Sequence, residues 1–174
     1  MLKRLFSALL MAALFTGCND VEDLLTFHFS DRTQIRIQSA SPLNLPVEIA
    51  TPAITSSSHQ QFENNNTKAE LVRDVKLEQL KLTLVSPSGK TFSFLENIRI
   101  FISTDESDEI ELASLDNITS STGILELTPT IEKLDVYAKS SSYNLRTEVT
   151  TDETLTEDVD VQVDLKFRVT ADTF

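Results

Sequence analysis

The clearest pattern in the chain is a strict alternation of apolar and polar side chains close to its C-terminus. Apolar residues occupy every second position from Val159 to Val169, and charged or polar residues stand between them. Successive side chains of a β-strand point to opposite faces, so the run predicts a strand with one buried and one charged face. A slip of one residue would invert both faces, so we expect its register to be well fixed.

Shorter alternating runs predict further strands. They cover residues 24–29, 33–38, 47–49, 75–84, 98–102, 109–115, 131–138 and 144–149. In the first of these, His28 is expected on the face opposite Phe27 and Phe29. The parity of apolar positions changes across Glu78-Gln79, which predicts a β-bulge there. Residues 139–142 are expected to form the turn of a hairpin whose two arms are residues 131–138 and 144–149.

Two stretches interrupt the strand pattern. Residues 55–67 are polar and low in complexity, and we interpret them as a long surface loop. Thr67 and Glu70 have the spacing of a capping box, which predicts one or two helical turns through about Asp74. Three prolines between residues 42 and 52 leave room only for a short or edge strand around Val47 and Ile49.

Together these elements predict an all-β fold. About seven to nine consecutive antiparallel strands, with no helix-length pattern between them, resemble a generic immunoglobulin-like β-sandwich, with no specific family identified. The cysteine and tryptophan hallmarks of true immunoglobulin domains are absent from the sequence, so only the general architecture is implied. A closed β-barrel is the alternative. The predicted domain covers residues 24–174.

Length and charge narrow the classes of function. A chain of 174 residues fits one domain together with targeting and linker segments. Acidic residues outnumber lysine and arginine by 27 to 15, and the sequence pI is about 4.5. Nucleic acids and other polyanions are therefore not expected as partners, because like charges repel.

The N-terminal segment has the pattern of a secretory signal. Met1 to Arg4 supply positive charge, and an apolar run from Leu5 to Phe15 follows, interrupted only by Ser7. The run is about half of the roughly 20 residues that a spanning helix needs, so a transmembrane anchor is the weaker alternative. An ordinary amphipathic helix is another alternative, but the run has almost no polar face. We expect this signal segment to be helical or disordered.

The sequence Phe15-Thr16-Gly17-Cys18 resembles the lipobox of bacterial lipoproteins, in which a leucine, a small residue and Gly or Ala precede an invariant cysteine. Phe15 stands where the family usually has leucine, and Thr16 where serine or alanine is commoner. The resemblance implies cleavage between Gly17 and Cys18, diacylglycerol on the Cys18 sulfur and acylation of the new amino group. It therefore implies a signal peptide at residues 1–17 and an anchor in the membrane through Cys18. Several acyl chains give stable membrane attachment where a single chain is marginal.

The residues after Cys18 indicate where the protein is held. Asp20, Glu22 and Asp23 make residues 18–23 an acidic tether. An acidic cluster at this place resembles the signal that exports some lipoproteins to the outer cell surface, although solvated linker residues give the same pattern. The predicted location is the bacterial cell envelope, at the outer membrane, on its periplasmic face or at the cell surface. Because the six residues from Cys18 to Leu24 span at most about 20 Å, the domain should lie close to its bilayer.

Candidate chemistry is sparse in the sequence. The two histidines are His28, within a predicted strand, and His59, within the predicted loop. Neither is accompanied by a nucleophile in a glycine elbow, so we predict no enzyme and no catalytic residue. Acidic residues at 105–109 and 152–158 offer hard oxygen ligands for calcium, but neither matches an EF-hand. Solvated turns are the simpler interpretation, so we predict no metal ligand and no cofactor.

Tyr137 and Tyr143 are the remaining candidates for a contact surface. They flank the expected hairpin turn, where they would form either an exposed contact or a packed cross-strand pair. The function predicted from the sequence is a non-catalytic envelope lipoprotein that contacts a protein partner, in assembly or adhesion. The alternatives are a glycan- or calcium-binding surface module and, as the weakest, a small hydrolase.

Overall fold

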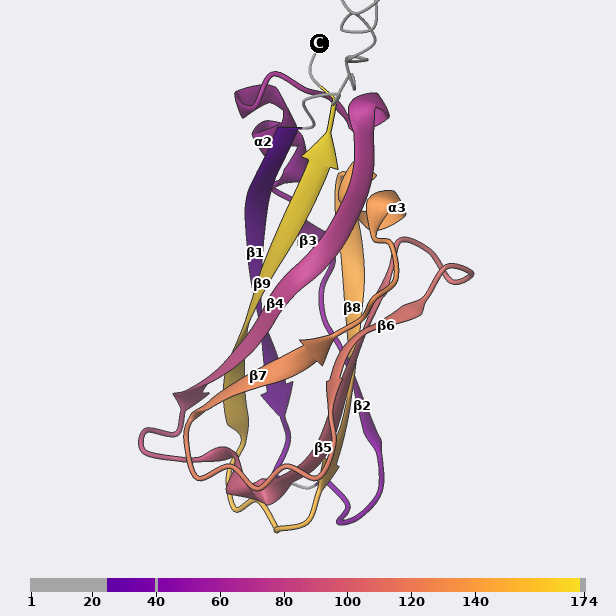
Figure 1. Cartoon of the computed structure of the whole chain (residues 1–174). Helices are drawn as coiled ribbons and strands as arrows, with labels where there is room; N and C mark the ends of the chain where they lie inside the picture. Colours follow the sequence, from indigo (N-terminus) through magenta and orange to yellow (C-terminus); the bar gives the residue numbers. More distant parts are fainter. Residues whose placement is uncertain (1–24, 40, 173–174) are drawn as a thin grey trace, which may run out of the picture.

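The computed structural model describes residues 25–39 and 41–172 (Figure 1). The expected signal peptide at 1–17 and the tether at 18–23 lie outside this part of the chain. The strands are β1 (Leu25–Ile37), β2 (Val47–Ala50), β3 (Ile54–Thr55), β4 (Val72–Ser86), β5 (Leu95–Ser103), β6 (Ile110–Leu115), β7 (Ile124–Pro129), β8 (Ser142–Thr151) and β9 (Val159–Ala171). The helices are α2 (Ser58–Asn64) and α3 (Asp135–Lys139), with short 3-10 turns η2 (Ala69–Leu71) and η3 (Phe92–Phe94).

The strands form one antiparallel sheet that curls on itself. Its order is β1-β9-β4-β7-β6-β5-β8-β2, and β3 pairs with β8 beside this path. β7 joins the two halves, because it pairs with β4 over residues 124–127 and with β6 over residues 128–129. The all-β, antiparallel prediction is confirmed. Two separate sandwich sheets are not confirmed, and the closed barrel is wrong, because the sheet is an open half-barrel that ends at β1 and β2.

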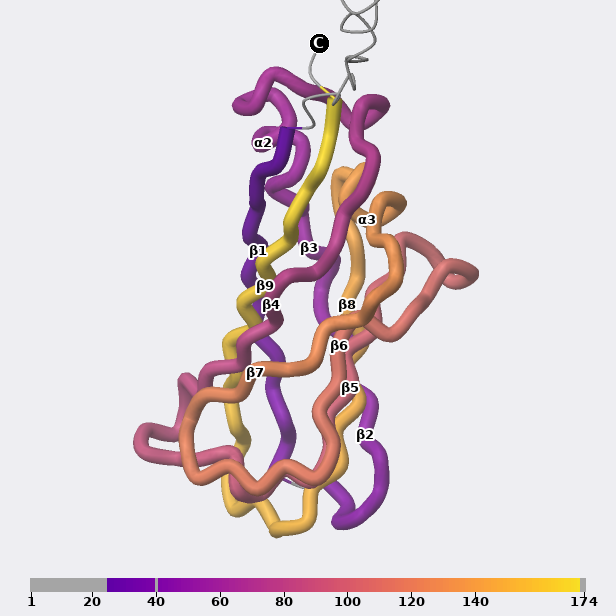
Figure 2. The backbone as a smooth tube through the Cα atoms, viewed as in Figure 1, coloured from indigo at the N-terminus to yellow at the C-terminus, as the bar shows by residue number. Residues whose placement is uncertain are grey.

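β9 lies in the middle of one half, as Figure 2 shows for the yellow strand. It pairs with β1 without a shift, from Leu25 opposite Ala171 to Ile37 opposite Val159. On its other side β4 shifts register between Leu77 and Gln79, which confirms the predicted bulge. β9 is therefore paired along both of its edges, without a register shift toward β1 and with three shifts toward β4.

β1 is one continuous strand of 13 residues, so the prediction of two strands at 24–29 and 33–38 is wrong. The alternation runs through residues 30–32 without a break, with Asp31 on the buried face between Phe29 and Thr33. The alternation of apolar residues did not predict one continuous strand, because the inward position 31 is occupied by an aspartate. His28 lies on the exposed face, as predicted.

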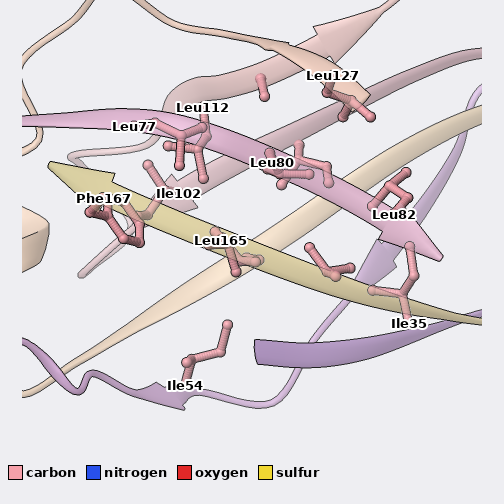
Figure 3. Close-up of a cluster of buried hydrophobic side chains, with 14 of the residues drawn as sticks. Ile35, Ile54, Leu77, Leu80, Leu82, Ile102, Leu112, Leu127, Leu165 and Phe167 are labelled. Atoms are coloured by element: carbon pink, nitrogen blue, oxygen red, sulfur yellow. The ribbon is translucent and has the colours of Figure 1, made fainter. Parts of the chain in front are cut away.

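The core lies between the two curled halves of the sheet (Figure 3). Leu77, Leu80 and Leu82 of β4 point inward beside Leu165 and Phe167 of β9 (Figure 3). All six alternating apolar side chains of β9 from Val159 to Val169 are at most 2% exposed. Burial of this face stabilises the strand by about 25 cal/mol for each Å² of apolar surface removed from water.

The expected surface loop at 55–67 is wrong, because it contains the helix α2. Phe62 is buried and its ring packs edge-on against Phe27, with centroids 6.1 Å apart. Ser58 is also buried, and its Oγ donates to the carbonyl of Ala138 at 2.7 Å. The buried ring of Phe62 and the buried hydrogen bond of Ser58 both fix this helix in place. The one or two helical turns expected from Thr67 to about Asp74 are only the three-residue 3-10 turn η2. It has no side-chain cap, so the predicted capping box does not form.

The expected hairpin around residues 139–142 is also wrong. Its first arm is a loop followed by α3, whose Tyr137 is buried beside the preceding Leu134. These two side chains have the spacing of a helical face, and Asp135 Oδ1 accepts a 2.8 Å bond from the amide of Val75. β8 instead pairs with β5 and β2. The pattern also did not reveal β7, which starts after the loop at Gly123.

Candidate interaction site

The two tyrosines expected near an exposed turn are both buried. Tyr137 is 5% exposed and Tyr143 is 2% exposed, so an exposed contact at these residues is excluded. The Tyr137 hydroxyl donates to the carbonyl of Asp108, and the Tyr143 hydroxyl donates to Asp31 Oδ2 at 3.0 Å. Burial, together with a nearby aspartate in each case, raises the pKa of both phenols. Both tyrosines therefore belong to the interior of the protein, where their hydroxyl groups bond to other segments of the chain.

Asp31 is a buried carboxyl that the sequence pattern did not single out. Its Oδ1 accepts the amide of Ser57 at 2.9 Å, while its Oδ2 accepts the Tyr143 hydroxyl. The Ser57 hydroxyl also donates to the carbonyl of Ser30 at 3.2 Å. These bonds connect β1 to β8 and to the start of α2 on the open side of the half-barrel. The signal in the sequence was the odd-numbered parity that Asp31 shares with Phe27, Phe29 and Ile35.

Among the described residues, Phe101 of β5 is the phenylalanine on an outer face of the sheet. Its neighbours Ile100 and Ile102 are fully buried, so Phe101 points to the opposite face, where it is half-buried. It lies directly across from Arg146 of β8, whose guanidinium carbon is 4.0 Å from the centre of the ring. A cation at this distance over an aromatic face is attracted by the ring quadrupole.

Three carboxylates surround this guanidinium, and we call the group Phe101, Arg146, Glu48, Glu109 and Glu148 the Phe101–Arg146 cluster. Glu109 binds the guanidinium as a bidentate fork. Arg146 Nε donates to Glu109 Oε2 at 3.1 Å, and Arg146 Nη2 donates to Glu109 Oε1 at 2.7 Å. Glu48 lies 3.0 Å from Nη1, and Glu148 lies 3.7 Å from it. The hydrogen bond from Arg146 lowers the pKa of Glu109, and that same bond raises the pKa of Arg146.

The charges of the cluster do not balance. Three carboxylates face one guanidinium, and the Glu48 side chain is 67% exposed. A shallow cavity of about 390 Å³ adjoins the cluster and is lined by Ser103, Asp105, Glu106, Glu109 and Asn144. This outer face therefore combines an aromatic ring and an arginine with an excess of negative charge. Aromatic and arginine side chains are enriched in protein interfaces.

In the acidic turn at 105–109, the carboxylates of Asp105 and Asp108 accept hydrogen bonds from nearby backbone amides and hydroxyl groups. Asp105 Oδ1 accepts both the amide and the hydroxyl of Ser107 at 2.7 Å. Asp108 accepts the amide of Thr104 at 2.8 Å and also its hydroxyl. Hydrogen bonds from Ser107 and Thr104 lower the pKa of the Asp105 and Asp108 carboxyls, respectively. We call residues 104–108 a closed turn, because the carboxylates of Asp105 and Asp108 are both bonded to groups within it.

The second acidic stretch, at 152–158, is connected to the end of β1. Asp158 Oδ1 accepts the amide of Ser39 at 3.0 Å, and this bond lowers the pKa of Asp158. Within residues 25–39 and 41–172, no group of three or more His, Cys, Asp or Glu side chains has the geometry to hold a metal ion.

The two histidines lie on different elements. His28 Nε2 is 3.3 Å from Glu78 Oε2, and the same carboxylate is 2.7 Å from Lys166 Nζ. The hydrogen bond from Lys166 is the main cause that lowers the pKa of Glu78. His59 of α2 is bonded to the carbonyl of Lys139 at 2.9 Å. Each histidine therefore contacts a different element from its own: His28 of β1 contacts Glu78 of β4, and His59 of α2 contacts Lys139 of α3.

The predicted cleavage and lipidation residues, Gly17 and Cys18, lie outside the described residues. In the described part of the chain, no helix has the length and apolarity that crossing a membrane requires.

The chain matches no family model and no curated protein. Among solved structures, it is similar to a protein of Desmodium yellow mottle tymovirus, at 10% identity over 86% of this chain and 90% of that chain, with a TM-score of 0.27. It is likewise similar to one of Turnip Yellow Mosaic Virus, at 13% identity over 86% of this chain and 96% of that chain, with a TM-score of 0.28. A likeness this low carries no argument about function.

Proposed function

We propose that the protein is a lipid-anchored component of the bacterial cell envelope whose β-domain is non-catalytic and binds a protein partner. The observation that carries the proposal is the sequence Phe15-Thr16-Gly17-Cys18 behind a charged and apolar start. In this proposal Cys18 carries the lipid, the outer membrane holds the protein, and the curled, sandwich-like sheet presents the surface that contacts the partner in assembly or adhesion.

The Phe101–Arg146 cluster is the surface proposed to contact the partner. Its aromatic ring and guanidinium are held in place by strand pairing and by the fork to Glu109, so little side-chain freedom is lost on binding. Its excess of carboxylates favours a partner surface that carries lysine or arginine. Attraction between opposite charges weakens with ionic strength, so the contact should be sensitive to salt.

A photo-crosslinking amino acid at Phe101 of the membrane-bound protein tests this contact. We expect one discrete adduct, which weakens in high salt and when Glu48 is changed to lysine. Thr83, on the outer face of β4, is the control position, because β4 belongs to the other half of the sheet. An adduct that forms at Thr83 but is absent at Phe101 would contradict the assignment of the surface.

A further inference from the structure

The outer side of β1, β9 and β4 carries more basic than acidic side chains. Apart from the buried Asp31, the charged side chains of β1 and β9 are Arg32, Arg36, Lys166, Arg168, Asp160 and Asp164. Those of β4 are Arg73, Lys76, Lys81, Asp74 and Glu78. None of these side chains is buried. Seven basic and four acidic side chains give a formal charge of +3 with His28 neutral, and we call this outer side the basic face.

The outer side of the other half of the sheet is acidic. The charged side chains of β5, β6, β8 and β2 are Arg99, Arg146, Glu48, Glu96, Glu111 and Glu148. The turn at 104–109 between β5 and β6 adds four acidic side chains and no basic one. Two basic and eight acidic side chains give a formal charge of −6. We call this side, which includes the Phe101–Arg146 cluster, the acidic face.

The segments between these strands do not remove the contrast. Glu126 of β7 bonds to Gln79 at the edge of the basic face and leaves that face at +2. Residues 130–139, beside the start of β4, contain two basic and two acidic side chains. Residues 152–158 contain four acidic side chains, but they connect β8 to β9 and belong to neither face.

Each face contains two like charges directly opposite each other on paired strands. On the basic face, Lys76 lies opposite Arg168, and within the described residues neither forms an ion pair. On the acidic face, Glu48 lies opposite Glu148, and both share Arg146 with Glu109. Like charges at opposite positions are unfavourable in an isolated sheet. A contact between the two pairs would give each cation a carboxylate.

We propose that the Lys76–Arg168 pair of one molecule binds the Glu48–Glu148 pair of a second copy of this chain. This inference rests on the proposed function, because it names the partner of the Phe101–Arg146 cluster. Two copies with a formal charge of −12 repel each other at a distance, so association favours the orientation in which faces of opposite sign meet.

The contact joins different surfaces of the two copies. The core lies between the two halves of the sheet, so the basic and acidic faces point away from each other (Figure 1). Such a heterologous contact repeats from copy to copy. Thr83 lies about 20 Å along β4 from Lys76, in an uncharged row with Gln34 and Gln162, and therefore stays outside the contact.

Zero-length crosslinking between isotopically distinct copies tests the inference. Full chains with normal nitrogen and full chains enriched in the heavy isotope are mixed in vesicles of phosphatidylethanolamine and phosphatidylglycerol. A carbodiimide then joins lysine amines to carboxylates that touch them. We expect mixed-isotope adducts in which Lys76 or Lys166 of one copy is joined to Glu48 or Glu148 of the other.

Charge reversal tests the polarity of the contact. Arg168→Glu on the basic face and Glu48→Lys on the acidic face should each abolish the mixed-isotope adducts, because like charges then meet. Both positions are exposed, so neither change should unfold the chain. A mixture of the two variants should restore the adducts, since Arg168→Glu keeps its acidic face and Glu48→Lys keeps its basic face. The carboxylate peptide should then come from the Arg168→Glu chain.

Lys90→Glu is the matched control. It changes the net charge as much as Arg168→Glu does, but it lies in the turn after β4 and outside both faces, so it should leave the adducts unchanged. The inference is overturned by the absence of mixed-isotope adducts between the two faces, by equal yields in Arg168→Glu and Lys90→Glu, or by a mixture of the two charge-reversal variants that gives no adduct.

Failure of this inference gives a different result from failure of the proposed function. If a crosslinker at Phe101 captures a different protein while the copies give no mixed-isotope adduct, the proposed partner contact stands and the second copy is excluded. If Phe101 captures no protein and the copies give no adduct, both proposals fall.

Discussion

The hydroxyl of Tyr143 donates a 3.0 Å hydrogen bond to Oδ2 of Asp31 in the interior of the protein. The two residues are 112 positions apart in the chain, on β8 and β1, which belong to the two halves of the curled sheet. β1 and β2 are the open ends of that sheet, so this polar contact supplements side-chain packing on the side where strand pairing stops. The amide of Ser57 completes the set of partners of Asp31.

Removing this hydroxyl should destabilise the fold. Tyr143→Phe leaves Asp31 Oδ2 buried without its donor, and the free energy of unfolding should fall by about 1–3 kcal/mol. Urea unfolding of the full chain measures the change. In an Asp31→Asn background the same substitution should cost less, because the carboxylate it serves has gone. Equal costs in both backgrounds would show that the two residues are not coupled.

The tyrosines should resist ionisation in the folded protein. Burial raises the pKa of both phenols above the ordinary 10.0, and the chain has two tyrosines and no tryptophan, so absorbance at about 295 nm reports these two groups alone. The folded state favours the neutral phenol, so its contribution to stability is present below pH 10 and is lost as the pH rises further.

Absorbance at pH 10 should therefore show less tyrosinate in the folded chain than in urea, where about half ionisation is expected. Equal ionisation at pH 10 in the folded chain and in urea would contradict the burial of the two rings.

The faces of β9 should respond very differently to truncation. Phe167 is 2% exposed and its ring stacks on Phe29, with centroids 4.6 Å apart. Phe167→Ala should cost about 3–5 kcal/mol in the free energy of unfolding, because it leaves a cavity in the core. The neighbouring Lys166→Ala removes a surface ion pair with Glu78 and should cost less than about 1 kcal/mol. Similar costs for the two variants would contradict the register of β9.

Asp108 should titrate below the ordinary aspartate value of 3.8, because Thr104 donates to its carboxylate. A lowered pKa means that the unfolded chain takes up the proton first. The bonds to Thr104 therefore stabilise the turn fully above pH about 4, and this stabilisation is lost as the pH falls through the lower value. Carbon-detected NMR titration of the side-chain carboxyl measures the pKa. A value at or above 3.8 would contradict the closed turn.

Alternation was enough to predict the strands whose apolar residues have an unbroken period. β9 and the bulge of β4 follow from it directly, because one wrong step would expose a row of valines. It failed where one or two residues decide the local structure. Asp31 interrupts the apolar pattern of β1 although the strand is continuous, and α2 is a polar stretch in which Ser58 and Phe62 are buried.

The alternation pattern could not predict the curl of the sheet or the residues of the interaction site, because both depend on contacts between strands that are distant in the sequence. β7 joins the two halves through pairs at its two ends, and no local pattern specifies that it changes partners. Phe101 is one of ten phenylalanines in the chain, and its alternation with Ile100 and Ile102 is the local signal that places its side chain on the other face of the strand. The carboxylates around Arg146 come from three separate segments.

The central claim is the lipid on Cys18, and the mass of the mature N-terminal peptide tests it most directly. Protein purified from bacterial membranes should give a peptide that begins at Cys18 and carries the added mass of a diacylglycerol and an amide-linked acyl chain. Gly17→Ala should give the same peptide, because alanine also occurs before the cysteine of a lipobox, whereas Cys18→Ser should leave the chain unlipidated. A peptide that begins at Met1, or a Cys18 without added mass, would contradict the account.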